Sequence, residues 1–101
     1  MKNPIVIAVD AMGGDNSPKK IIDGVELYVK KNKNIYFKLF GNKSLIEKSL
    51  KDKKIDKNIF EIIHTDNYIK GEDSARSAAK KGKTSSMWMS IESVKNKTSD
   101  I

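Results

Sequence analysis

The stretch PIVIAVDAMGGDNSP, residues 4–18, decides the fold of this 101-residue chain. It opens with a nearly continuous run of β-branched residues, which is typical of a strand buried on both faces in a parallel sheet. Two adjacent glycines follow, and they give the next loop unusual backbone freedom. Ser17 and Pro18 then form a helix start, with Ser17 as the N-cap and Pro18 in the first helical position. The stretch therefore predicts a strand over residues 4–10, a loop, and a helix near 18–31.

The same alternation continues along the rest of the chain. Apolar runs predict strands near residues 35–40 and 59–64, and apolar residues at helical spacing predict helices near 43–51 and 85–96. In the last helix Met87, Ile91 and Val94 fall on one side.

Strands that alternate with helices favour parallel βαβ units with right-handed crossovers. The sequence thus predicts an α/β fold: a three-layer, Rossmann-like parallel sheet with flanking helices. Residues 98–101 read as the lead-in to a fourth strand. We therefore interpret the sheet as incomplete and residues 1–101 as the truncated, N-terminal part of a single α/β domain.

The composition limits the class of protein. Hydrophobic residues make up 38% of the chain, which allows a core of modest size. The chain has no cysteine, so disulfides and Cys-based zinc sites are excluded. No apolar stretch approaches the ~20 residues of a membrane span, and the first apolar run is too short for a signal peptide. We expect a cytoplasmic protein.

The net charge of +7 has two interpretations: attraction to nucleic acid, anionic lipid or an acidic protein, or a solvated lysine-rich surface. Arg76 is the single arginine among the 20 basic residues. Because arginine is the usual side chain for planar phosphate and base recognition, the composition favours the second interpretation and argues against nucleic acid as the main partner.

The first candidate site lies where the first strand meets the first helix, at Asp10, Gly13, Gly14, Asp15 and Ser17. Ligands of open α/β sheets bind at the carboxyl ends of strands, and a helix N-terminus favours an anion such as phosphate. The glycine spacing matches neither a dinucleotide-binding nor a Walker motif, so a tight turn with a capped helix is the alternative. Asp10 and Asp15 would repel phosphate directly. We expect them, with Ser17, to orient the backbone, cap the helix or hold a lysine.

The second candidate site is the segment KKGKTSS, residues 80–86, in which a basic stretch meets hydroxyl side chains at a helix start. Lys80, Ser85 and Ser86 could form an anion site there. The alternative is a solvated basic loop in which Ser85 caps the helix. His64, the single histidine, has no matched acid or nucleophile in the sequence, so we interpret it as structural.

The segment IAVDAMGGD, residues 7–15, followed by Pro18, is similar to the opening of the phosphate acyltransferases of bacterial phospholipid synthesis, the PlsX family. A second similarity runs from Ala78 and Lys80 through residues 84–87 (TSSM) to 92–95 (ESVK). The resemblance covers nearly the whole chain, with two departures. The family commonly has arginine where this chain has Lys80, and a family proline near residue 75 is absent.

The resemblance implies that inorganic phosphate attacks the thioester of a fatty acyl–acyl carrier protein, which gives acyl phosphate. It implies no metal and no organic cofactor, and it makes Gly13, Gly14, Lys80, Ser85 and Ser86 candidates for phosphate or substrate contact. No catalytic residue is assigned within the chain.

The implied partners are acyl carrier protein and inorganic phosphate, with a homodimer in the full-length form and peripheral association with the membrane. Family members are several times longer, and this chain ends just before their Ser-Ala-Gly-Asn-Thr-Gly segment, so we expect the chain alone to be inactive. Two alternatives stay open: a non-catalytic remnant that binds carrier protein or a membrane surface, and a basic nucleic-acid-binding domain.

Overall fold

The computed structural model of the chain describes residues 3–69 and 74–101. Its strands and α-helices follow one another as β1 (Ile5–Asp10), α1 (Lys19–Lys31), β2 (Ile35–Gly41), α2 (Lys43–Leu50), β3 (Phe60–His64), α3 (Ala75–Lys81) and α4 (Ser86–Lys95). Short 3-10 turns, η1 (Lys57–Ile59) and η2 (Gly82–Thr84), precede β3 and α4. None of the helices in these ranges combines the length and the apolar character needed to cross a bilayer.

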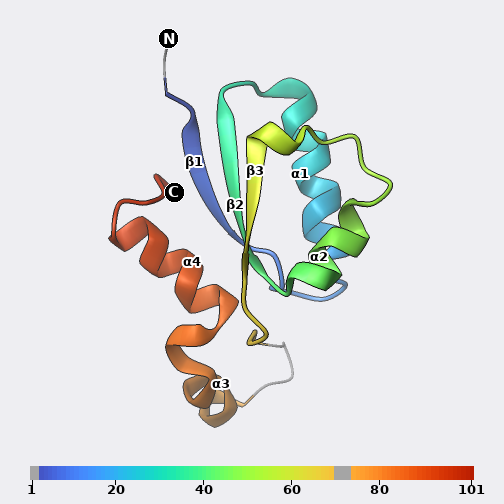
Figure 1. Cartoon of the computed structure of the whole chain (residues 1–101). Coiled ribbons are helices and arrows are strands. Elements are labelled where there is room, and N and C mark those ends of the chain that lie inside the picture. Colours follow the sequence, from blue (N-terminus) through green and yellow to red (C-terminus); the bar gives the residue numbers. More distant parts are fainter. Residues whose placement is uncertain (1–2, 70–73) are drawn as a thin grey trace.

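The three strands form one parallel sheet in the order β1-β2-β3. Phe37 in the middle strand stands opposite Ile7 of β1 and Phe60 of β3. Helices α1 and α2 cover one face of the sheet, and α4 lies on the other face (Figure 1). The predicted α/β fold with a parallel sheet and flanking helices is therefore confirmed.

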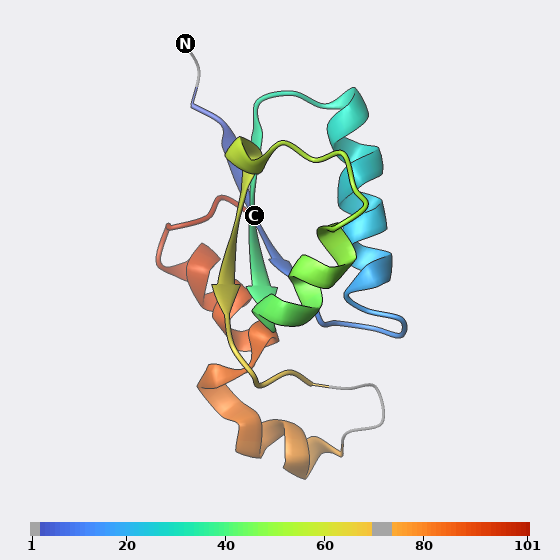
Figure 2. The same cartoon turned by 45° about the vertical axis from the view of Figure 1, so that its right-hand side comes forward.

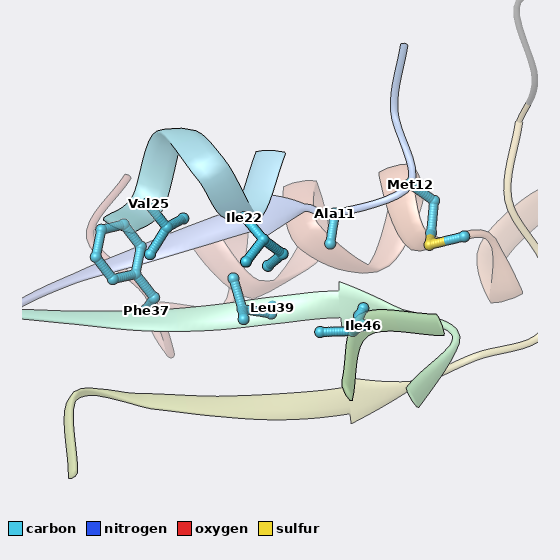
Figure 3. Close-up of a cluster of buried hydrophobic side chains, with 7 residues drawn as sticks. All are labelled: Ala11, Met12, Ile22, Val25, Phe37, Leu39 and Ile46. Carbon is cyan, nitrogen blue, oxygen red and sulfur yellow. The ribbon is translucent and has the colours of Figure 1, made fainter. Parts of the chain in front are cut away.

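The core lies between the sheet and the layer of α1 and α2 (Figure 3). Its buried side chains come from both helices, from β2 and from the loop after β1: Ala11, Met12, Ile22, Val25, Phe37, Leu39 and Ile46. Burying a side chain of the size of leucine or isoleucine contributes about 1.5–3 kcal/mol to stability. This cluster fixes the carboxyl ends of β1 and β2 relative to each other, because Met12 packs there together with Ile46.

Helix α4 turns a polar side to the sheet. Ser86, Ser90 and Ser93 are buried, while Met87 and Ile91 are exposed. The apolar side expected from the sequence exists, but it lies on one flank of the helix and does not face the sheet. Small side chains allow a helix to approach a strand closely, so the serines fit between α4 and the sheet where larger residues would hold the helix off.

The end of the chain returns to the outer side of β1, as the C label in Figure 1 shows. The Val6 N–H donates to Asp100 Oδ2 at 2.8 Å, and the Asp100 N–H donates to the Val6 carbonyl at 2.7 Å. Asp100 and Ile101 thus lie along the outer edge of β1, in the place expected of a chain that enters a fourth strand.

Candidate functional site

The candidate site lies at the carboxyl edge of the sheet. The loop over residues 11–18 leaves β1 there, and residues 65–69 leave β3 there. Figure 2 shows α3 and the start of α4 at the same end of the molecule as the arrowheads of the strands. Both segments that the sequence singled out therefore belong to one edge of the sheet.

A hydrogen bond between Asp10 and Ser86 joins the two segments. The Ser86 hydroxyl donates to Asp10 Oδ1 at 2.6 Å, across a sequence separation of 76 residues. The same carboxylate oxygen accepts from the Met12 N–H at 3.1 Å. Ser86 is fully buried, so the Asp10 carboxylate is its polar partner inside the protein. The start of α4 is thereby held against the glycine loop.

Two glycines shape the loop for different reasons. A Cβ atom on Gly13 would lie 3.1 Å from Asp10 Oδ2, so a side chain there would press on the carboxylate that holds Ser86. Gly14 has a φ of 81°, a backbone conformation that side-chain-bearing residues rarely adopt. The carbonyl of Gly13 accepts a hydrogen bond from the Ser17 hydroxyl, which closes the loop on itself.

The structure differs from the prediction at the start of α1. Pro18, not Ser17, is the N-cap residue, and it makes no side-chain capping hydrogen bond. The Ser17 hydroxyl is directed to the Gly13 carbonyl, which removes it from the helix start. Asp15 is exposed and does not cap the helix. The Ser17 side chain therefore stabilises the loop, and neither side chain caps the helix.

Ser85 caps α4. Its hydroxyl accepts from the Trp88 N–H at 3.1 Å, and its side chain is buried. The hydroxyls of Ser85 and Ser86 are thus both engaged within the protein. Lys80, in contrast, is exposed in the last turn of α3. No hydrogen bond or ion pair within residues 3–69 and 74–101 joins Lys80 to Gly13 or Gly14.

Residues directly after β3 hold the start of α4 in place, and the sequence analysis missed them. The Ser86 N–H donates to the Asn67 carbonyl at 2.9 Å, and Asn67 Nδ2 donates to Thr84 Oγ1 at 2.7 Å. The Thr65 hydroxyl donates to the Thr84 carbonyl. Their position in the sequence is the feature that could have identified them, because polar side chains that directly follow a buried parallel strand lie at the ligand-binding edge of the sheet.

His64 has a structural role in the described residues. Its Nδ1 accepts from the Lys43 N–H at 3.0 Å, at the start of α2, and its Nε2 lies 3.2 Å from Asp66 Oδ1. These contacts fix the turn between β2 and α2. No group of three or more His, Cys, Asp or Glu side chains in the described ranges could hold a metal ion.

Met12 anchors the glycine loop by packing over Gly41 at the end of β2. A Cβ atom on Gly41 would lie 2.7 Å from Met12 Cγ and 3.1 Å from Ile46 Cδ1. We expect Gly41→Ala to lower the free energy of unfolding by about 1–3 kcal/mol, because it overpacks this contact. Chemical denaturation measures the change.

The matched control for Gly41→Ala is Gly24→Ala in α1, where a Cβ atom meets nothing within 4 Å. We expect Gly24→Ala to stabilise the chain by about 0.5–1 kcal/mol, since alanine favours a helix more than glycine does. Equal effects of the two substitutions would contradict the role given to Gly41.

A parallel sheet with helices on both faces, and with a glycine loop held against a helix start at its carboxyl edge, defines an α/β domain of the kind that binds ligands at that edge. The comparison with known families is consistent with this class. Residues 5–101 match the family described as "Fatty acid synthesis protein", and the chain belongs to it.

Curated relatives named "Phosphate acyltransferase" match nearly the whole chain. The relative from Pelagibacter ubique is 52% identical over 101 residues, which cover 100% of this chain and 30% of the relative. The relative from Enterococcus faecalis is 44% identical over 94 residues, 93% of this chain and 27% of the relative. The relative from Rhodospirillum rubrum is 38% identical over 95 residues, 94% and 27% of the two chains. The chain therefore spans less than a third of the length of these relatives.

Proposed function

We propose that this chain forms the amino-terminal part of a phosphate acyltransferase. The enzyme would transfer a fatty acyl group from acyl carrier protein to inorganic phosphate and so make acyl phosphate for phospholipid synthesis. The names of the relatives and the description of the family support the class of reaction. The observation that carries the proposal is the Ser86–Asp10 hydrogen bond, which brings the glycine loop and the start of α4 together at the ligand-binding edge.

The glycine loop is the proposed place of the phosphate. Backbone N–H groups in a loop of this kind can approach an anion closely, because Gly13 and Gly14 carry no side chain. We assign Lys80 as the cation that compensates the phosphate charge. The hydroxyls of Ser85 and Ser86 already have partners, so we assign them first to holding α4 against the loop. A direct contact with phosphate would require either hydroxyl to exchange its partner.

In the proposed reaction, a phosphate oxygen attacks the carbonyl carbon of the thioester. The new C–O bond forms, the C–S bond breaks, and the sulfur of the carrier protein leaves and takes up a proton. The chemistry needs phosphate held in line with the carbonyl and donors for the developing oxyanion, and it needs no metal or organic cofactor. The net charge of +7 suits the approach of an acidic carrier protein.

We also propose that the full-length form is a homodimer that associates peripherally with the membrane. Both statements are carried over from the resemblance to the longer relatives, and this chain matches 30% of the Pelagibacter ubique protein. Sedimentation of a chain extended by the remaining part of that relative would test the homodimer. Binding of the same extended chain to vesicles of anionic phospholipid would test the membrane association.

Lys80→Ala tests the phosphate site in a chain extended by the remaining part of the Pelagibacter ubique relative. We expect the KM for phosphate to rise about tenfold or more, because a charge-assisted hydrogen bond contributes about 1.5–3 kcal/mol. The measurement is the phosphate dependence of acyl phosphate formation. Lys80→Arg should keep most of the affinity, since it keeps the charge.

The control for Lys80→Ala is Lys48→Ala, which removes an exposed lysine of α2, a helix on the face of the sheet opposite α4. That variant should leave the KM for phosphate unchanged. An unchanged KM for phosphate in Lys80→Ala as well would remove Lys80 from the proposed site.

A further inference from the structure

The outer edge of β1 carries the first step of a fourth strand. In the described sheet, β1 pairs with β2 on one side only. On the other side the Ile101 N–H donates to the Val6 carbonyl at 3.3 Å, and the Ala8 N–H donates to the Ile101 carbonyl at 2.7 Å. Two hydrogen bonds from one residue to the neighbours of Ile7 form the pattern of a parallel strand pair. The next outward-facing groups along this edge are the carbonyl of Ala8 and the N–H of Asp10.

The apolar side of α4 lies over this edge. On one flank of the helix, Met89, Ser93 and Asn96 line a groove with residues of β2 and β3. Successive residues of an α-helix are turned by about 100°. With the buried serines facing the sheet, this places Met87, Ile91 and Val94 on the opposite flank, towards the free side of β1. We call these three residues the apolar flank of α4.

The handedness of the crossovers between strands determines which element can lie beside the apolar flank of α4. Crossovers between parallel strands are right-handed. Helices α1 and α2, which carry the chain from β1 towards β3, therefore share one face. Helix α4 carries the chain back to the far side of β1 and lies on the other face (Figure 1). A further crossover in that same direction must place its helix on the face of α4, next to the apolar flank.

We propose that the free edge of β1 and the apolar flank of α4 together bind one strand–helix unit. The strand pairs in parallel with β1 and continues from Ile101, and an apolar side of the helix packs on Met87, Ile91 and Val94. The occupant is the polypeptide that follows the matched segment in the longer relatives, of which this chain covers 30% in the Pelagibacter ubique protein. The apolar flank is exposed in the chain by itself, and Ile91 is 59% accessible. It therefore offers an apolar surface on which the apolar side of the added helix can pack.

The proposed interface would bring a further loop to the candidate site. This placement follows from the fold and does not depend on the proposed reaction. The two strands beside each other would be β1, whose helix lies on one face, and the new strand, whose helix lies on the other. Ligands of α/β sheets bind at such a switch point, at the carboxyl ends of the two strands. The loop after the new strand would therefore lie next to Asp10 and Gly13.

The test uses this chain and a second polypeptide, made of the part of the Pelagibacter ubique relative that lies beyond the match, produced together. We expect a complex of one copy each by sedimentation. Ile91→Lys should weaken it at least about tenfold, because it places a charge in an apolar contact. The matched control is Leu27→Lys, which changes a similarly exposed residue on α1, 64% accessible, on the other face of the sheet. It should leave the affinity unchanged.

Two further measurements keep the test decisive if the second polypeptide does not fold separately. In a single chain that joins the two parts, Ile91→Lys should lower the Tm and Leu27→Lys should not. Hydrogen exchange at the Asp10 amide should be slower in the joined chain than in the 101-residue chain. Equal effects of the two lysine substitutions in the joined chain, or unchanged exchange at Asp10, would overturn the proposal.

Other occupants give distinct results with the 101-residue chain alone. A dimer that Ile91→Lys dissociates would show that a second copy covers the apolar flank. Binding to vesicles of anionic phospholipid that depends on Ile91 would show that a lipid surface covers it. Either result would overturn the assignment to a strand–helix unit.

Discussion

Asp10→Ala is expected to lower the free energy of unfolding of the chain by about 3 kcal/mol. The substitution removes one carboxylate oxygen that accepts from both the Met12 N–H and the Ser86 hydroxyl. A hydrogen bond to a charged group contributes about 1.5–3 kcal/mol, and a buried donor left without an acceptor costs about 1–3 kcal/mol. Ser86 is fully buried, so water cannot replace the carboxylate there without a rearrangement of α4.

Chemical denaturation of four variants resolves the contribution of this contact. Ser86→Ala alone should cost about 1 kcal/mol, because Asp10 keeps the Met12 N–H as a donor. The double variant should be more stable than the sum of the single effects predicts, since the hydroxyl without an acceptor is gone. Asp15→Ala, an exposed carboxylate in the same loop, should change stability by about 0.5 kcal/mol or less. If Asp10→Ala were as mild as Asp15→Ala, the contact would not hold the two segments together.

The 101-residue chain alone is expected to form acyl phosphate at least about 10⁴-fold more slowly than the same chain extended by the remaining part of the Pelagibacter ubique relative. Positioning of reacting groups can contribute about 7–11 kcal/mol, and each 1.4 kcal/mol corresponds to about a factor of ten in rate. The chain holds one side of the proposed phosphate site, and its hydroxyl side chains there are engaged within the protein. The measurement is phosphorolysis of acyl–acyl carrier protein with each purified form.

The outcomes of this assay separate the proposed functions. Robust turnover by the short chain would mean that residues up to Ile101 contain the whole catalytic apparatus. Turnover by neither form, with the extended chain folded in a thermal melt, would contradict the proposed reaction. Binding of acyl carrier protein or anionic vesicles by the short chain without turnover would support a non-catalytic remnant.

The sequence predicted the fold well because local patterns determine it. The β-branched run at 5–10, the apolar and aromatic run at 35–41 and the helix over 19–31 have patterns that a single sequence reveals, and the structure has them within one or two residues. Within residues 3–69 and 74–101, the sequence pattern did not predict helix α3, which is rich in alanine, serine and lysine and has no apolar side that repeats along it. Periodicity cannot reveal such a helix, although alanine favours it.

The sequence predicted the candidate site as two separate segments but not as a set of contacts. The Ser86–Asp10 hydrogen bond joins residues 76 positions apart, which no local pattern specifies. A serine at position 17 could either cap α1 or close the loop. In the structure the Ser17 hydroxyl donates to the nearby Gly13 carbonyl, so it closes the loop. The apolar side of α4 was visible in the sequence. The direction in which this apolar side points was not visible in the sequence, because it depends on which side of the helix can approach the sheet closely.

The position of β1 affects how the chain folds during its synthesis. A ribosome releases β1 well before Asp100 and Ile101, yet these two residues supply hydrogen-bonding partners to the outer side of β1. Closing so long a loop is entropically costly and slow compared with pairing β1 to β2. A nascent chain that stalls before Ser86 therefore exposes an extended strand with free backbone groups, which is the form most prone to pair with another unfolded chain.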